Sequence, residues 1–167
     1  MITVAQKRSR AFTLLESLLA VVVLAMAVTA IIMPFTAAAT NQQVDARRSL
    51  AVGLAQEIME EILTKPFHDP QGSSSLGPEI GETSRTLFDN IDDYHGYTED
   101  PGGICSFDGA IIDEPESVGL SREVTAGYIY VSGQDVSEDP TFIRVVVEVK
   151  YSDQPLVTLT RLVYALD

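Results

Sequence analysis

The sequence contains no tryptophan, one cysteine and two histidines. Cys105 cannot form an intramolecular disulfide, and no second thiol or histidine–cysteine cluster completes a zinc site. His68 and His95 have no serine, cysteine or second histidine at a catalytic spacing. The short motifs of serine hydrolases, zinc proteases, P-loop NTPases and dinucleotide-binding enzymes are also missing. We therefore expect a protein without enzymatic activity and without a cofactor.

Basic residues are scarce. The 11 lysines and arginines face 24 acidic residues, which gives a formal net charge of -13. Nucleic-acid binding requires a basic surface that displaces counterions from phosphates, so this composition excludes nucleic acid as a partner. Three basic residues, Lys7, Arg8 and Arg10, lie in the first eleven positions, which hold no acidic residue. The rest of the chain is therefore strongly acidic, as expected of a soluble surface with strong self-repulsion.

Charged residues are missing altogether between positions 17 and 44, where the longest apolar run lies. Residues 14–35 are long enough to cross a membrane as a helix, since about 20 residues span the hydrocarbon core. The basic cluster before this run keeps residues 1–10 in the cytoplasm by the positive-inside rule. The C-terminal domain is therefore expected outside the cytoplasm, behind a single membrane-spanning segment.

An ordinary secretory signal is the alternative explanation of this run. Such a signal has a shorter apolar core that ends in a cleavage site of small residues. The core here is longer, but the alanines at positions 37–39 offer a site of that kind at its far end. Export with cleavage near Ala39 thus stays open beside a retained membrane helix.

The segment RAFTLLES, followed by the apolar run, resembles the class III signal of type IV pilins and type II secretion pseudopilins. That family has a short basic leader, a small residue, and Phe-Thr-Leu-x-Glu at the start of a hydrophobic helix, which residues 12–16 match. The chain has Ala11 where the family usually has glycine. The resemblance implies cleavage between Ala11 and Phe12 by a membrane prepilin peptidase, which also methylates the new amino terminus of Phe12.

Glu16 is the fifth residue after the expected cut. A charged acid within a membrane helix costs roughly 2.5 to 3.5 kcal/mol on insertion scales, so it usually has a partner. Cleavage creates an ammonium group at Phe12, and in a stack of subunits the carboxylate of one chain can meet the amine of its neighbour. In the family, the matching glutamate is tied to recruitment and register. The alternative is an acid near the helix start that the helix dipole favours and that needs no partner.

The helix is expected to continue beyond the membrane. Leu50, Leu54, Ile58 and Ile62 recur every four positions and predict one apolar face. Pro66 predicts an end at residues 64–65. Pro34 predicts a kink or a locally melted turn, or else it marks the end of a membrane anchor before a separate helix.

Residues 66–140 lack sustained periodicity and read as loops with short strands. The string FDNIDDYHGY places Asp89, Asp92 and Asp93 close together with Asn90, and these are weak candidates for calcium ligands. Their spacing is not that of an EF-hand, and a structural loop is the favoured interpretation. The same string, with MEEIL at the end of the helix, is similar to minor pilins akin to the D subunit of mannose-sensitive haemagglutinin pili.

Three segments near the C-terminus are rich in valine, isoleucine, tyrosine and threonine. Residues 123–132, 141–151 and 156–166 predict antiparallel strands, with a hairpin loop at 152–155. A sheet with one apolar face needs a cover, which the apolar face of the helix can supply. The expected fold class is α+β, with a long N-terminal helix on a small antiparallel sheet, as the pilin resemblance also implies.

These observations predict four regions: a basic leader (1–11), the membrane half of the helix (12–39), its amphipathic half (40–65), and an acidic globular domain (66–167). The resemblance implies a structural minor pilin or pseudopilin of the bacterial inner membrane. Its partners are then the prepilin peptidase, the assembly platform and other pilin subunits of a type IV pilus or a type II secretion pseudopilus. A membrane-anchored extracytoplasmic binding module that enters no filament is the alternative.

Overall fold

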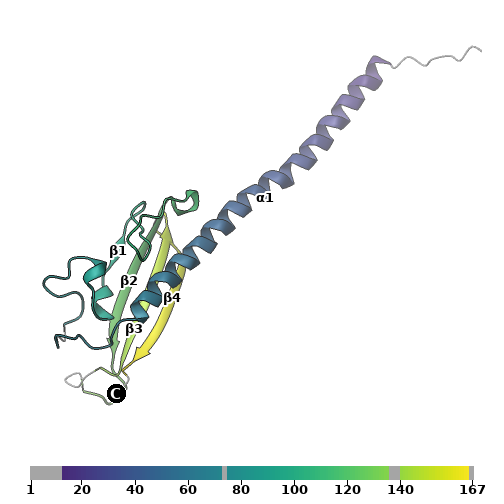
Figure 1. Cartoon of the computed structure of the whole chain (residues 1–167). Helices are drawn as coiled ribbons and strands as arrows, with labels where there is room; N and C mark the ends of the chain where they lie inside the picture. The colour runs from purple at the N-terminus through teal and green to yellow at the C-terminus, as the bar shows by residue number, and fades with distance from the viewer. Residues whose placement is uncertain (1–12, 73–74, 136–139, 166–167) are drawn as a thin grey trace, which may run out of the picture. The chain divides into compact units, whose positions relative to one another are not determined.

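The structure is a computed structural model that describes residues 13–72, 75–135 and 140–165. The chain divides into two compact units, Met1–Gln43 and Val44–Asp167. Its elements are the helix α1 (Leu14–Leu63), the short 3-10 helices η1 (Arg85–Leu87), η2 (Asp92–Tyr94) and η3 (Pro115–Ser117), and the strands β1 (Thr98–Glu99), β2 (Leu120–Ile129), β3 (Phe142–Tyr151) and β4 (Gln154–Tyr164) (Figure 1). One long helix and one small antiparallel sheet confirm the expected α+β class.

The C-terminal end of α1 follows from the residues around Pro66. The amides of Thr64 and Lys65 donate to the carbonyls of Glu61 and Ile62, both at 3.1 Å, which tightens the last turn into 3-10 geometry. The Thr64 hydroxyl also donates to the Glu61 carbonyl at 2.6 Å. Pro66 disfavours helix in the residue before it, so the helix ends at Leu63, one residue before the expected position.

The sheet has the order β1-β2-β3-β4, and every neighbouring pair is antiparallel. β2 begins at Leu120, three residues earlier than the sequence suggested, and the two-residue β1 was not predicted at all. The β3–β4 connection is also shorter than the expected loop at 152–155. It consists of Ser152 and Asp153, whose φ angles of 49° and 63° are those of a tight hairpin turn. Pro155 lies within β4, an edge strand, where a missing amide donor is tolerated.

Side chains alternate between the two faces of β2 and β3, as a pleated sheet requires. The register places Val124 opposite Val147 and Ala126 opposite Val145, and all four are buried. The buried positions of the two strands on this face are Leu120, Arg122, Val124, Ala126, Ile143, Val145, Val147 and Val149. One charged residue, Arg122, thus lies in an otherwise apolar row.

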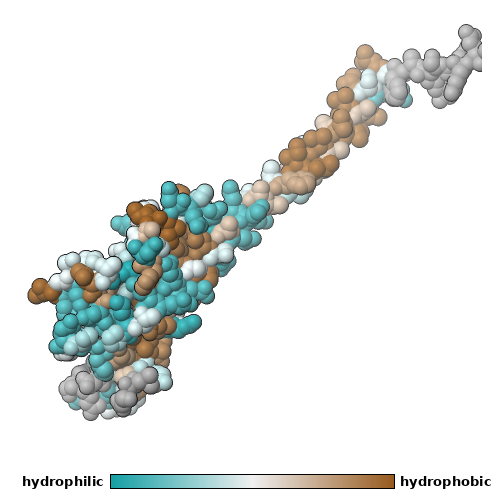
Figure 2. All heavy atoms as spheres, in the orientation of Figure 1, coloured by the Kyte–Doolittle hydropathy of each residue, from teal (hydrophilic) through white to brown (hydrophobic). Residues whose placement is uncertain are grey.

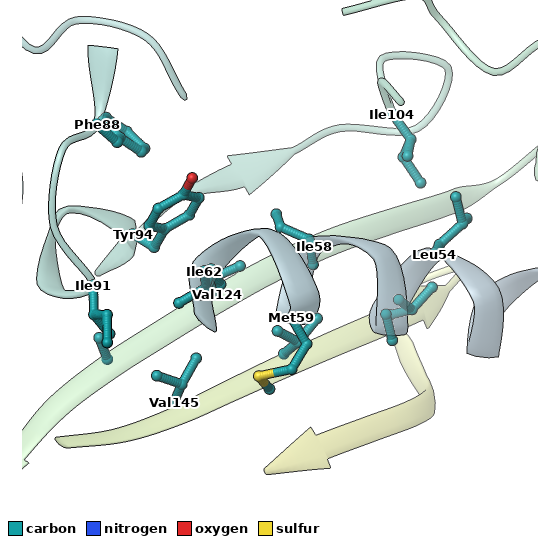
Figure 3. Packing of buried hydrophobic residues seen from close by; sticks show 14 of the residues in the cluster. Leu54, Ile58, Met59, Ile62, Phe88, Ile91, Tyr94, Ile104, Val124 and Val145 are labelled. Atoms are coloured by element: carbon teal, nitrogen blue, oxygen red, sulfur yellow. The ribbon is translucent and has the colours of Figure 1, made fainter. Parts of the chain in front are cut away.

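The amphipathic half of α1 covers this face of the sheet. Its buried side chains recur at intervals of three and four residues and form the apolar stripe, made of Ala51, Leu54, Ala55, Ile58, Met59 and Ile62. Figure 3 shows Ile58, Met59 and Ile62 from the helix beside Val124 and Val145 from the strands. Phe88, Ile91, Tyr94 and Ile104 complete the core from the loops. The predicted cover of the sheet by the helix is confirmed.

Each of the three guanidinium nitrogens of Arg122 donates to an acceptor. Its Nε donates to Glu99 Oε2 at 2.5 Å, Nη1 to the Leu54 carbonyl at 2.9 Å, and Nη2 to the Cys105 carbonyl at 2.8 Å. The guanidinium therefore joins β2 to β1, to α1 and to the loop after β1. A buried charge is tolerated only when such partners replace its hydration.

A second guanidinium, that of Arg85, extends this network. Arg85 Nε donates to both carboxylate oxygens of Glu61 at 3.0 and 2.9 Å, and Nη1 lies 3.4 Å from Glu99 Oε1. The Tyr94 hydroxyl donates to Glu61 Oε1 at 2.7 Å. Burial opposes ionisation of Glu61, but the hydrogen bonds from Arg85 and Tyr94 hold its pKa below the usual value. Burial and the hydrogen bond to Glu99 raise the pKa of Tyr97 to about 12.

Shortening Ile58 tests the helix–sheet packing. Ile58→Ala leaves a cavity between α1 and the sheet and should lower the free energy of unfolding by about 2–5 kcal/mol. The measurement is denaturant unfolding of the full chain in detergent micelles, followed by the near-ultraviolet circular dichroism of its tyrosines. Ile80→Ala is the control, because Ile80 is fully exposed. Equal effects of the two changes would contradict the proposed cover.

Removing Arg122 tests the buried ionic network. Arg122→Met leaves the Glu99 carboxylate buried without its main partner, and should lower the free energy of unfolding by about 3–5 kcal/mol in the same assay. The control is Lys150→Met, which breaks the partly exposed pairs with Glu123 and Glu148 and should change stability little. Adding Glu99→Gln to Arg122→Met should recover part of the loss, since the unpaired charge is then removed.

Candidate functional site

The first unit offers an exposed apolar surface. Between positions 14 and 35 the large exposed side chains are Leu14, Leu15, Leu18, Leu19, Val21, Val22, Val23, Leu24, Met26, Val28, Ile31, Ile32, Met33 and Phe35. Figure 2 shows apolar atoms covering this part of α1 on the face in view. By length and composition, α1 is the one helix among the described residues able to cross a membrane. Such a surface is unfavourable in water, which is consistent with single-pass membrane anchoring.

Glu16 is part of a capping box at the start of α1. Thr13 precedes the first helical residue, and its hydroxyl accepts the Glu16 amide at 3.3 Å. Glu16 Oε2 in turn accepts the amide and the hydroxyl of Thr13, both at 3.4 Å. The pattern Thr-x-x-Glu satisfies two amides that no helical carbonyl can reach. The carboxylate also lies in the first turn, where the helix dipole favours negative charge.

This geometry bears on the two interpretations of Glu16. The reciprocal bonds give the carboxylate partners within its own chain, which supports the interpretation that needs no neighbour. The bonds are long, however, and the Glu16 side chain stays exposed. The Phe12 amine lies outside the described residues, as do Ala11 and the leader charges Lys7, Arg8 and Arg10. Pairing of Glu16 with Phe12 of a neighbour therefore stays a prediction.

A shallow hollow lies beside Glu16 on the surface of α1. Its volume is about 470 Å³, and Glu16, Leu19, Ala20, Val23, Leu24 and Ala27 line it. The small side chains of Ala20 and Ala27 lie one to three turns beyond the carboxylate. Small residues let the backbone of another helix approach closely in a membrane. The hollow is therefore suited to a second apolar helix.

Pro34 lies inside α1, which continues as one helix on both sides of it. Proline has no amide hydrogen, so the carbonyl of Ala30 loses its helical partner. Two threonine hydroxyls bind backbone carbonyls in the turns that follow. Thr36 donates to the Met33 carbonyl at 2.9 Å, and Thr40 donates to the Thr36 carbonyl at 3.0 Å. The alternative of a separate helix after Pro34 is therefore wrong. The kink at Pro34 stays a prediction.

Three carboxylates in the second unit gather into what we call the acidic cluster: Glu79, Glu82 and Asp93. One oxygen of each lies within 4.8 Å of the others. A tight turn brings the two glutamates together, because the Glu82 amide donates to the Glu79 carbonyl at 3.1 Å and the Glu79 amide donates to Glu82 Oε2 at 3.0 Å. The turn thus places two acids against η2, to which Asp93 belongs.

Asp93 is positioned by the loop that precedes η2. Its Oδ2 accepts the amides of Asp89 and Asn90 at 2.7 and 3.0 Å, and its own amide donates to Asn90 Oδ1 at 3.0 Å. These bonds are the local side-chain caps by which aspartate and asparagine stabilise loops. They agree with the structural-loop interpretation of FDNIDDYHGY.

The other weak metal candidates, Asp89 and Asp92, each accept a hydrogen bond on one carboxylate oxygen from a side chain outside the acidic cluster. Asp89 Oδ2 accepts from Gln71 at 2.8 Å, and Asp92 Oδ2 accepts from the Tyr128 hydroxyl at 2.5 Å. The structure thus brings Asp93, but not Asp89 or Asp92, into the acidic cluster. Sequence reasoning missed Glu79 and Glu82. Their only signal was two acids in the glycine- and proline-containing stretch at 77–82, ten or more residues before Asp93.

The histidines and the cysteine take part in local loop contacts. His95 Nδ1 lies 2.6 Å from the Ala126 carbonyl oxygen, and the His68 ring packs edge-on against Phe67 with centroids 4.9 Å apart. The Cys105 thiol donates to the Gly103 carbonyl at 3.3 Å. Each of these groups faces a neighbouring backbone or ring. None of these contacts pairs a nucleophile with a base.

Comparison with known families finds one match. Residues 6–32 match the family described as the prokaryotic N-terminal methylation motif. No curated protein and no solved structure matches the chain. The matched segment contains the capping box and the start of the exposed apolar surface, and a motif of this type points to a structural protein family. The chain therefore carries a type IV pilin-like prepilin signal, of the kind that a prepilin peptidase processes.

Proposed function

We propose that the protein is a structural minor pilin or pseudopilin subunit, assembled into a type IV pilus or a type II secretion pseudopilus. The observation that carries the proposal is the match of residues 6–32 to the methylation motif. Residues 14–32 of this match form the exposed apolar start of a helix whose far half belongs to a folded α+β unit. A signal, an apolar helix and a soluble unit in this order are what such a subunit requires.

Before assembly, the subunit is held in the bacterial inner membrane by the first half of α1. The leader charges Lys7, Arg8 and Arg10 keep the N-terminus in the cytoplasm. The acidic unit, Val44–Asp167, then lies in the periplasm, and outside the cell once the filament extends. The prepilin peptidase cuts between Ala11 and Phe12 and methylates Phe12. The assembly platform then passes the subunit into the filament.

Within the filament, Glu16 pairs with the Phe12 amine of a neighbouring subunit. Two features of the structure support this contact. The carboxylate is exposed, and its own-chain bonds to Thr13 are long at 3.4 Å. A bond between a carboxylate and an ammonium group, in which both partners are charged, is stronger than the long bonds from the uncharged amide and hydroxyl of Thr13, and the apolar surroundings favour pairing further. The hollow beside Glu16 provides room for the apolar helix of that neighbour.

The narrower likeness to the D subunit of mannose-sensitive haemagglutinin pili rests on two strings. FDNIDDYHGY contributes Phe88, Ile91 and Tyr94 to the core, and MEEIL contributes Met59 and Ile62 to the apolar stripe. Both strings therefore serve the packing of the second unit. We extend the proposal to a minor subunit of this kind.

Processing predicts the first residue of the mature protein. Mass spectrometry of the protein from cells with a prepilin peptidase should find an N-terminal Phe12 that carries one added methyl group. The Ala11→Gly variant should be cut at the same bond at least as completely, since glycine allows the closest backbone approach. A mature protein that begins at Met1, or near Thr40 after ordinary signal cleavage, would overturn the proposal.

The assembly role of Glu16 predicts how two substitutions differ from wild type. Glu16→Gln keeps the capping box, because glutamine serves at this position, but removes the charge. Glu16→Ala removes both. If the neighbour's ammonium is the partner, both variants are processed normally and the fraction of mature subunit in sheared filaments falls by a large factor.

Normal incorporation of Glu16→Gln would show instead that Glu16 acts only as a helix cap. Processing is measured in the same cells as a control, so that poor cleavage is not mistaken for poor assembly. Absence of the wild-type chain from filaments would favour the alternative, a membrane-anchored extracytoplasmic binding module.

A further inference from the structure

We propose that the acidic cluster of Glu79, Glu82 and Asp93 is a binding site for a calcium ion. The site lies in the second unit and uses none of the residues assigned to processing or assembly. It therefore stands or falls independently of the proposed function.

The positions of the three carboxylates fit a calcium ion. One oxygen of each lies within 4.8 Å of the others. Calcium binds oxygen at about 2.3–2.6 Å, so two oxygens on opposite sides of the ion lie up to about 5 Å apart. A single calcium ion can thus contact all three groups after small shifts of their side chains. Three carboxylates form the hard oxygen set that calcium prefers.

The cluster contains oxygen atoms that lack partners. Asp93 is fully buried, and its Oδ1 has no hydrogen-bond donor in the described part of the chain. Both carboxylate oxygens of Glu79 are covered as well, and neither has a donor there. A buried carboxylate oxygen without a partner costs free energy unless a cation or another donor replaces its hydration. These atoms are therefore an observation that points to a ligand, separate from the grouping of the acids.

The charges around the cluster also favour a cation. The five ion pairs among residues 13–72, 75–135 and 140–165 include none of its three acids. Asp89 and Asp92 flank Asp93 and add further negative charge. A divalent cation relieves the repulsion among these carboxylates, as like-charged groups in one site require.

A solvent path leads to the cluster. Glu82 and Asp93 line a hollow of about 290 Å³, together with residues that include His95 and Arg85, whose guanidinium pairs with Glu61 and Glu99. Water in this hollow can fill the coordination positions that three carboxylates leave open, since calcium takes six to eight oxygens. No cysteine lines the hollow, and the three acids of the cluster offer only oxygen ligands, the set that calcium prefers.

Calcium at this position ties two segments together. Glu79 and Glu82 belong to the turn before η1, whereas Asp93 belongs to η2, whose Asp92 accepts from Tyr128 of β2. The ion therefore links the turn at 79–82 to η2, and through Asp92 to β2. Binding to the folded state alone raises the unfolding temperature by mass action.

Calorimetric titration of the chelator-treated full chain in detergent micelles tests the site. Calcium chloride should bind at one ion per chain, with a dissociation constant of about 10⁻⁴ to 10⁻³ M, the range of extracellular modules. Glu82→Gln should weaken binding by about tenfold or more, since the charge of the ligands sets the affinity. Glutamine can still accept the Glu79 amide, so the turn is retained.

Glu114→Gln is the matched control, because Glu114 is exposed and lies outside the cluster. It should bind calcium like wild type. Thermal unfolding is a second test, because calcium should reverse the difference in unfolding temperature between variant and wild type. Glu82→Gln should unfold at or above the wild-type temperature with chelator, and below it with calcium. Absence of calcium binding by the wild-type chain at millimolar concentration would overturn the proposal. Equal affinity of Glu82→Gln and Glu114→Gln would also overturn it.

Discussion

The packing of the apolar stripe of α1 on β2 and β3 is the constraint on which the second unit depends. A four-stranded antiparallel sheet needs a cover on its apolar face, and the stripe from Ala51 to Ile62 supplies it. The row it covers contains Arg122, a charge in the position of an apolar side chain. The buried guanidinium then requires acceptors from every element around it, namely Glu99, the Leu54 carbonyl and the Cys105 carbonyl.

Buried polar groups also hold the loops, which have few apolar residues, against the core. Glu61 lies at the edge of the apolar stripe and binds Arg85 and the Tyr94 hydroxyl, which come from the loops that follow the helix. Arg85 Nη1 also donates to the Cys105 carbonyl at 3.1 Å, an acceptor that it shares with Arg122. The loops that follow the helix are therefore held in place by a connected polar network over the core. Such a network fixes one arrangement only when all its members are satisfied.

The elements that could be predicted from the sequence are those with a regular residue pattern. The four-residue recurrence from Leu50 to Ile62 predicted the apolar stripe, and the β-branched runs predicted β2, β3 and β4 within a few residues. The hairpin within 152–155 was also predicted, but its length of two residues was not, because neither Ser152 nor Asp153 is the glycine that usually marks such a turn. The partners of Arg122 and the meeting of Glu79 with Asp93 could not be predicted. Each depends on where the chain returns after an irregular loop, and no local periodicity records that.

The capping box changes how the carboxylate of Glu16 is understood. A charged group in the apolar part of a helix is costly when it stands alone, and this cost was the reason to expect a partner from another chain. The bonds to Thr13 and the helix dipole provide partial compensation inside a single subunit. The charge in the apolar helix is therefore tolerated without a neighbour. Because the compensation is partial, a neighbouring ammonium still lowers the free energy when the two meet, so the same carboxylate serves first the helix start and then the proposed contact.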